Sequence, residues 1–392
     1  MIPHKPTIVV NRNTPHAVEA FSRIGNIVSL DTREVTRESV REAEILIVRS
    51  ETRVDASLLE GSAVKFVGTV TIGTDHIDLD YLNERGIAFA SAPGSNSNSV
   101  AEYIAAAVLV WARRTGDTLR GKTLGIVGVG NVGSKVERVA RALGMNVLLN
   151  DPPRARAAGD ASFRTLDELM EADLISLHVP LTKSGADATY HLFDETRIEK
   201  MKQGSVLINT SRGAVVETEA LRAALSAKYL STAILDVWEG EPVIDADLPH
   251  RALIGTPHIA GYSLDGKINA LKMVYERVCS FLHATDAWTV DLARESSELM
   301  PIVVPEDMTD ETDLLAFAVR QGYDIEVDDM MLREAAALNA NERGTYFMKL
   351  RAEYRIRREF FTRTVELTSS QASIQATLEQ LGFKTLVREE AR

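Results

Sequence analysis

Cysteine is almost absent: the 392 residues contain only Cys279, so no disulfide can form within the chain. A reducing compartment fits this usage, and we expect a cytoplasmic protein. Long apolar runs are also lacking, because the longest, around IAAAVLVWA, is far shorter than the roughly 18 residues of a membrane span. The opening MIPHKPTIVV has no apolar core of a signal peptide. These absences predict a protein without a membrane partner.

Positive charge is in deficit, since 44 Lys and Arg residues face 56 Asp and Glu residues, a formal net charge of −12. Such a surface repels polyanions, so we expect no nucleic-acid partner, although a local basic pocket for a small anion is compatible with this balance. The hydrophobic and charged fractions of 45% and 26% are those of a globular protein. The length exceeds that of one ordinary core and predicts two or three domains.

The first part of the chain alternates short β-branched runs with helical periodicity. The helices are expected near residues 17–24 and 56–60, and the strands at residues 7–10, 27–30, 45–49, 66–70 and 88–91. This pattern predicts a small parallel α/β unit over residues 1–97. A polar turn, SNSNS, and an apolar helix over residues 100–113 then indicate a hinge into a second unit.

The second unit opens with a glycine-rich turn between a strand and a helix, GIVGVGNVG. Gly128, Gly130 and Gly133 suit a tight turn, a close approach to a pyrophosphate and close packing of helix on strand. The next strand, NVLLND, ends in Asp151, where a carboxylate can bind the adenosine ribose and repel a 2′-phosphate. The turn, with Asn131 and Val132 between its glycines, therefore predicts a dinucleotide site for NAD rather than NADP. An ordinary glycine-rich βα turn is the alternative.

The alternation continues with strands expected at residues 174–179, 205–211, 231–237 and 253–256, the pattern of a doubly wound sheet. Three reactive stretches follow these strands: NTSRGAVV, LDVWEGEP and TPHIAGY. Arg212 offers a planar fork for a carboxylate, His258 could take a hydroxyl proton, and Glu241 could orient the imidazole. Each residue alone could be structural, as an ion pair, a core histidine or a turn carboxylate. Together, beside a dinucleotide site, they predict hydride transfer.

These four motifs together resemble the D-2-hydroxyacid dehydrogenase family, and the likeness covers nearly the whole chain. It implies a Rossmann NAD-binding domain at 98–262, a flavodoxin-like substrate domain at 1–97 completed by about 263–285, and a C-terminal α/β dimerisation domain at 286–392. By the same resemblance the catalytic residues are Arg212, Glu241 and His258. It further implies that NAD contacts Asp151, Val179, Asp236 and Gly261, and that substrate contacts Ser50, Thr71 and Tyr262.

Within this family the sequence most resembles the members that oxidise a phosphorylated hydroxy acid. Stretches such as VGTVTIGTDHIDLDYL and PHIAGYSLDGK carry this closer resemblance. Arg49 ends a strand directly before Ser50, which makes it a candidate for the substrate phosphate. The sequence departs from the family pattern at Asn11-Arg12-Asn13, at Ser95 and at Val179, which affects local contacts. 3-Phosphoglycerate or another D-2-hydroxy acid is the alternative substrate. An NADH-sensing binding protein on the same scaffold is the alternative of another class.

The C-terminal segment has no catalytic constellation, and the resemblance implies that it forms a homodimer. Helices are expected at residues 314–323, 330–355 and 371–381, with strands at RTVEL and FKTLV. The run KLRAEYRIRREFFTR holds Arg351, Arg355, Arg357, Arg358 and Arg363. A solvated helix face is the favoured interpretation, and an arginine that reaches the substrate phosphate across the dimer is the other.

TDHID is interpreted as a helix start, capped by Thr74 or Asp75, rather than as a metal site.

Overall fold

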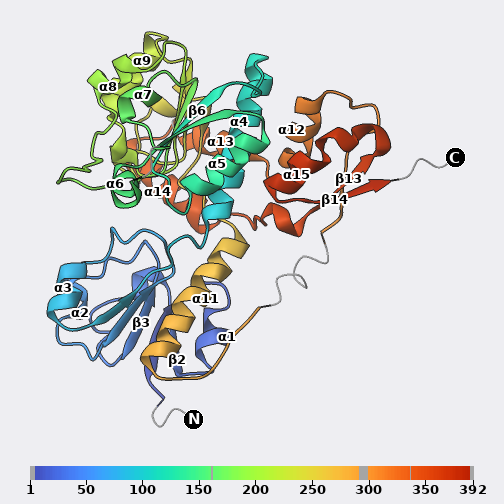
Figure 1. Ribbon diagram of the computed structural model, residues 1–392. Helices are drawn as coiled ribbons and strands as arrows, with labels where there is room; N and C mark the ends of the chain where they lie inside the picture. The colour runs from blue at the N-terminus through green and yellow to red at the C-terminus, as the bar shows by residue number, and fades with distance from the viewer. Residues whose placement is uncertain (1–4, 160–161, 291–298, 336, 389–392) are drawn as a thin grey trace. The chain divides into compact units, whose positions relative to one another are not determined.

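The structure, a computed structural model, describes residues 5–159, 162–290, 299–335 and 337–388. The chain divides into two compact units, Met1–Asn96 with Ser263–Glu295 and Ser97–Tyr262 with Ser296–Arg392 (Figure 1). Every sheet within them is parallel, and the predicted α/β fold class is confirmed. Among the described residues no helix combines the length and the apolar character needed to cross a membrane.

The first unit is built on a five-stranded sheet in the order β2-β1-β3-β4-β5, which is the flavodoxin-like order. Its strands are β1 (Thr7–Asn11), β2 (Asn26–Leu30), β3 (Ile45–Val48), β4 (Phe66–Thr69) and β5 (Ala88–Ala90). Its helices are α1 (Ala17–Phe21), α2 (Ala56–Leu59), α3 (Leu79–Glu84) and α11 (Leu264–Phe281), with the 3₁₀ turn η1 (Thr32–Glu34). Central strand β3 is fully buried, as expected for a parallel sheet covered on both faces.

Helix α11 completes the core of the first unit although it comes late in the chain. It packs against β4 at Gly68, where an added Cβ would lie 2.6 Å from Val274 Cγ1. The rings of Phe66 and Phe281 lie 5.2 Å apart, centroid to centroid. Any larger residue at position 68 would therefore push α11 off the sheet.

The second unit holds a six-stranded sheet in the order β11-β10-β9-β8-β6-β7. The strands are β6 (Thr123–Val127), β7 (Asn146–Asn150), β8 (Leu174–Leu177), β9 (Val206–Asn209), β10 (Thr232–Leu235) and β11 (Ile254–Gly255). An isolated parallel bridge between Leu149 and Phe163 lies beyond β7 and supplies the missing third position. With that bridge the order is 3-2-1-4-5-6-7, which is the Rossmann order 3-2-1-4-5-6 with β11 added as a seventh strand at the edge.

Different helices cover the two faces of this sheet. Helices α4 and α5 share one buried cluster with Leu124 and Ile126, whereas α7, α8 and α9 share another with Ile175 and Leu207. The helices and 3₁₀ turn of this part are α4 (Ser97–Thr115), α5 (Gly133–Ala142), α6 (Pro152–Ala158), α7 (Leu166–Leu169), α8 (Glu195–Lys200), η2 (Gly213–Val215), α9 (Thr218–Ser226) and α10 (Leu248–Arg251). The strand ends that carry the predicted site therefore emerge from a sheet buried on both faces.

The C-terminal segment adds a three-stranded parallel sheet in the order β12-β13-β14. Its strands are β12 (Ile302–Val303), β13 (Thr364–Thr368) and β14 (Lys384–Arg388). Its helical elements are α12 (Glu311–Gly322), α13 (Ile325–Ala335), α14 (Ala340–Ala352), α15 (Gln375–Leu381), η4 (Phe360–Thr362) and η5 (Ser369–Ile374). Both strands expected here are confirmed.

Two expectations for this segment are wrong. The helix expected over residues 330–355 is broken, because Asn339 caps a new helix through a capping box with Glu342. The arginine-rich run is not a solvated helix face, since α14 ends at Ala352 and Arg357 and Arg358 are only 4% and 8% exposed.

In the first unit, the expected helix cap in TDHID is also wrong. The cap is Asp78, which accepts from the Tyr81 N–H, rather than Thr74 or Asp75.

Candidate active site

The loops after β9, β10 and β11 meet because these strands are neighbours in one parallel sheet. Backbone hydrogen bonds continue past the strand ends: the Asp236 N–H donates to the Asn209 carbonyl at 3.0 Å, and the His258 N–H donates to the Asp236 carbonyl at 2.7 Å. Arg212, Asp236 and His258 therefore follow three adjacent strands at the same edge. Carboxyl ends of parallel strands are where ligands of such folds bind.

His258 and Glu241 form a hydrogen-bonded pair in this loop cluster. Nδ1 of His258 lies 2.8 Å from Oε2 of Glu241, while Oε1 of Glu241 accepts from the Trp238 N–H at 2.7 Å. The indole of Trp238 donates in turn to the Thr256 carbonyl at 2.9 Å. The imidazole side chain is 32% exposed. Since Glu241 occupies Nδ1, Nε2 is the ring nitrogen that can exchange a proton with a substrate.

Glu241 stays ionised in this setting. Burial works against its charge, but the charge of His258, the hydrogen bonds from His258 and Trp238, and the charge of Arg351 together hold the pKa of Glu241 below its usual range. A carboxylate beside Nδ1 fixes the ring orientation and stabilises the protonated imidazole. The structure places Glu241 against Nδ1 of His258, and the predicted role of Glu241 in catalysis stays a prediction.

Asp236 lies beneath the histidine loop with 1% exposure. Its carboxylate accepts from the N–H groups of Ile259 and Ala260, at 2.7 and 2.9 Å, and from the Thr256 hydroxyl at 2.6 Å. Burial raises its pKa despite the nearby His258 and these hydrogen bonds. In the structure this side chain positions the loop that carries His258, Gly261 and Tyr262.

The turn that carries Arg212 packs against the loop that carries Glu241. An added Cβ on Gly213 would lie 1.9 Å from the Trp238 carbonyl carbon and 2.3 Å from the Glu239 nitrogen. Only glycine allows this approach, so the NTSRGAVV and LDVWEGEP stretches touch through their backbones. Arg212 itself donates from Nη1 to the Ser211 carbonyl at 2.7 Å.

The glycine-rich turn has the shape expected for a dinucleotide. Gly128 has φ 87°, and a Cβ there would meet the His178 carbonyl at 2.6 Å and Val179 Cγ1 at 2.8 Å. A Cβ on Gly133 would lie 2.0 Å from the Gly128 carbonyl oxygen, whereas one on Gly130 would meet no protein atom within 4 Å. Packing thus requires Gly128 and Gly133, while Gly130 faces open space, as close approach of a pyrophosphate demands.

The helix and strand beside this turn complete the cofactor site. Helix α5 starts at Gly133 with no side-chain cap at Val132, so its first N–H groups can bind phosphate. Asp151 follows β7 and accepts from the Val129 N–H at 2.9 Å, which places the carboxylate against the glycine turn. Asn131 is exposed at the tip of this turn. These residues fit NAD.

The predicted substrate residues of the first unit follow its strands. Arg49, 15% exposed, donates to the Asn13 carbonyl at 3.1 Å and lies 3.7 Å from Glu51. Burial, and then the charge of Arg49, lower the pKa of Lys267 to about 8, so a second cation lies near Arg49. Thr71 donates to the Gly73 carbonyl at 2.9 Å. Ser50 is exposed.

Sequence reasoning missed several residues of this neighbourhood. Arg357 donates to the carbonyls of Ala260 and Ser99, at 3.1 and 2.7 Å, and so holds the histidine loop from behind. His191 and Glu239 form a second histidine–glutamate pair, with Nε2 2.6 Å from Oε1. No local motif marks these contacts, because the partners are far apart in the sequence.

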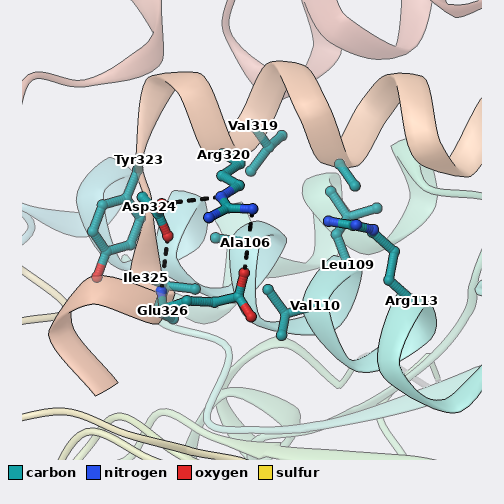
Figure 2. Close-up of a pocket in the computed structure, with 11 residues that line it drawn as sticks. Ala106, Leu109, Val110, Arg113, Val319, Arg320, Tyr323, Asp324, Ile325 and Glu326 are labelled. Carbon is teal, nitrogen blue, oxygen red and sulfur yellow. Dashed lines mark hydrogen bonds and ion pairs between the residues drawn. The ribbon is translucent and has the colours of Figure 1, made fainter. Parts of the chain in front are cut away.

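A small hollow lies between α4, α12 and the start of α13 (Figure 2). Leu109, Val110 and Val319 form part of its apolar wall, and Arg320 crosses it to reach Asp324 at 3.0 Å. None of the residues predicted to bind substrate or cofactor lines it. The hollow is a packing feature between two helices rather than the reaction site.

A histidine held by a carboxylate, at the strand ends of a sheet that also carries a dinucleotide turn, is suited to hydride transfer from an alcohol carbon. The protein is therefore of the NAD-dependent dehydrogenase class, and residues 100–260 match the model of the D-isomer specific 2-hydroxyacid dehydrogenase NAD-binding domain. The chain is 44% identical over 386 residues to an erythronate-4-phosphate dehydrogenase from Salinibacter ruber. The aligned region covers 96% of this chain and 98% of that protein. The chain belongs to the erythronate-4-phosphate dehydrogenase family.

Other comparisons agree. An erythronate-4-phosphate dehydrogenase from Klebsiella pneumoniae is 42% identical over 97% of this chain and 98% of its own length. The crystal structure of D-lactate dehydrogenase from Aquifex aeolicus with NAD and lactic acid matches at a TM-score of 0.60 and 29% identity, over 70% of this chain and 95% of that one. Residues 297–382 match a domain of unknown function. NAD is thus the cofactor.

Proposed function

We propose that the protein oxidises 4-phospho-D-erythronate to 3-hydroxy-2-oxo-4-phosphobutanoate, with NAD as the oxidant, as a step toward pyridoxal 5′-phosphate. Relatives named erythronate-4-phosphate dehydrogenase, at 42% to 44% identity over nearly the full length, support this choice of substrate. The observation that carries the chemistry is the 2.8 Å pair between His258 Nδ1 and Glu241 Oε2. 3-Phosphoglycerate is the competing substrate.

The residues divide the reaction between them. Nε2 of His258 takes the proton of the C2 hydroxyl while the C2 hydride is transferred, and Glu241 stabilises the imidazolium that results. Arg212 binds the substrate carboxylate through its planar fork. Gly128, Gly130 and Gly133 would hold the pyrophosphate of NAD and Asp151 its ribose, with Val179, Asp236 and Gly261 as further contacts. Bound there, NAD would supply the hydride acceptor. Ser50, Thr71, Tyr262 and Arg49 bind the rest of the substrate.

NADH formation with a panel of D-2-hydroxy acids tests this proposal. We expect the phosphorylated four-carbon acid to give the highest kcat/KM, and preference for 3-phosphoglycerate or an unphosphorylated acid would refute it. His258→Asn removes the proton acceptor and should lower kcat by about two to four orders of magnitude while NAD still binds. Loss of NAD binding with turnover intact would show that His258 is structural.

The proposal includes a cytoplasmic homodimer joined through the C-terminal segment. One face of the C-terminal sheet supports this proposal. Val303 and Leu386 are 50% and 51% exposed, and both pair with Glu366 on the central strand, so the two side chains lie on the same face. Parallel sheets are almost always covered on both faces. A second copy of the chain is the occupant we assign to this face. The single cysteine supports a reducing compartment.

A further inference from the structure

One arginine of the C-terminal segment lies at the histidine–glutamate pair of its own chain. Arg351, in the last turn of α14, donates from Nη2 to the Tyr262 hydroxyl at 3.0 Å. Its Cζ lies 5.7 Å from the centroid of the same ring. Tyr262 follows His258 by four residues in one loop. The guanidinium therefore reaches a predicted substrate contact within the second unit.

Arg351 also acts on the dyad electrostatically. Burial works against the charge of Glu241, and after His258, Arg351 is the second charged group that lowers its pKa.

The helix that carries Arg351 is held firmly. Phe347 and Leu350 are 0% and 9% exposed and belong to a buried cluster of the nucleotide-binding sheet. Tyr354 packs edge-on against Tyr262 with centroids 5.8 Å apart. A guanidinium mounted on packed residues loses little conformational entropy when it binds an anion.

The neighbouring arginines have structural tasks. Arg357 is 4% exposed, donates to the carbonyls of Ser99 and Ala260 and lies 3.8 Å from the Tyr323 ring centroid. Arg355 pairs with Asp328 and donates to the Asp324 carbonyl at 2.8 Å. These two hold the C-terminal segment on the nucleotide-binding part, whereas Arg351 contacts Tyr262.

A phosphorylated substrate needs fixed positive charge in a chain whose net charge is −12. The D-lactate dehydrogenase crystallised with lactic acid is matched over 95% of its length by only 70% of this chain. The remainder of this chain therefore has no counterpart in an enzyme that binds an acid without phosphate. The match to a separate family over residues 297–382 includes Arg351.

Resting on the proposed function, we propose that Arg351 is a substrate-binding residue, supplied by the C-terminal segment to the active site of the same chain. Its guanidinium binds the terminal phosphate, and the Tyr262 hydroxyl orients it. The C-terminal segment thereby sets the preference for a phosphorylated acid. This assignment differs from both sequence interpretations of the run, the favoured solvated helix face and the alternative arginine that reaches the phosphate across the dimer.

The test compares 4-phospho-D-erythronate with D-erythronate in the full-length enzyme. Arg351→Gln keeps a hydrogen-bond donor but removes the charge, and should lower kcat/KM for the phosphorylated acid by about 10- to 100-fold. The unphosphorylated acid has no phosphate to lose and should fall far less, by an amount that reports only the effect of the Arg351 charge on Glu241. Competitive inhibition by inorganic phosphate should weaken in parallel. Arg351→Lys should restore most of the loss.

Lys349→Gln is the matched control, because Lys349 is on the same helix with a side chain 60% exposed and should leave both substrates unaffected. Equal loss on both acids in Arg351→Gln, or no loss on either, would overturn the proposal. A mixed subunit experiment adds a second criterion: heterodimers of Arg351→Gln with His258→Asn chains should show the Arg351 defect in full. Turnover by the unmodified protein tests the proposed function separately.

Discussion

At the scale of single residues, His258 has a left-handed backbone with φ 58°, which a side chain with a Cβ rarely adopts. Such a conformation costs on the order of 1–3 kcal/mol and persists only where the surroundings over-determine it. Its N–H donates to the carbonyls of Asp236 and Thr256, at 2.7 and 3.1 Å. Strain of this kind is concentrated at functional sites, where it aims a side chain.

The role of Glu241 can be tested through the pH profile. Glu241→Gln removes the negative charge that lies against His258 Nδ1 and stabilises the imidazolium formed in the reaction. The acid limb of kcat/KM for oxidation should therefore move to lower pH, with a reduced maximum. Burial lowers the pKa of His178 to about 3, so that histidine cannot account for the limb.

The second histidine–glutamate pair supplies the control for this experiment. Glu239→Gln makes the same chemical change two residues away but affects His191, to which Glu239 is bound at 2.6 Å. It should leave the acid limb in place. An acid limb that moves equally in both variants would mean that loop structure, rather than the charge of Glu241, sets the profile.

Arg49 is the candidate phosphate residue in the first unit. Arg49→Ala should raise KM for the phosphorylated acid by about 10- to 150-fold, because a charge-assisted hydrogen bond is worth roughly 1.5–3 kcal/mol. KM for the unphosphorylated analogue should change little. Arg53→Ala, at a site 75% exposed, is the control. Equal effects on both acids would assign Arg49 to the carboxylate or to the fold.

The residues whose place the sequence predicted differ in kind from those whose contacts it did not foresee. Arg212, Glu241 and His258 each follow a strand within a short, distinctive stretch, and the order of a doubly wound sheet brings such stretches to one edge. Arg351 and Arg357 contact residues about 90 to 260 positions away. An arginine-rich run specifies charge but not its partners, so tertiary packing alone decides which arginines are buried.

At the scale of elements, the broken helix of the C-terminal segment shows the same limit. Apolar periodicity continues through residues 330–355, and it favoured one helix. The capping box of Asn339 and Glu342 is a local signal that outweighs periodicity, because it satisfies helix N–H groups at a new start. That signal was present in the sequence. The break lets α14 run in its own direction and carry Arg351 to Tyr262.

Cofactor choice belongs to the turn between β6 and α5 and to the end of β7. Asp151→Ala should weaken NAD and relax discrimination against NADP, because the carboxylate binds the ribose and repels a 2′-phosphate. Asp151 also accepts from Val129 and Arg154 backbone N–H groups, so Asp151→Asn is the cleaner variant. The ratio of kcat/KM for NAD to that for NADP is the measurement. An unchanged ratio in both variants would remove Asp151 from cofactor selection.

At the scale of the whole molecule, the exposed sheet face predicts the oligomeric state. Leu386→Asp places a charge on a side chain that is 51% exposed in the single chain, so the fold should tolerate it. If this face joins two copies, sedimentation should show monomers at concentrations where the unmodified protein is dimeric. Val18→Asp, at a side chain 48% exposed on α1, is the control. A dimer that persists in Leu386→Asp would place the interface elsewhere.

The late position of α11 governs the order in which a growing chain can fold. On the ribosome, strands β1 to β5 emerge first, but the helix that packs on Gly68 and Phe66 belongs to residues 264–281. The whole nucleotide-binding sheet is translated in between. During that interval the part of the sheet that α11 covers in the folded protein stays uncovered. At a translation rate of about 5–20 residues per second, the interval lasts on the order of ten seconds or more. The nascent first unit therefore exposes the apolar surface beneath α11 until translation reaches residue 281.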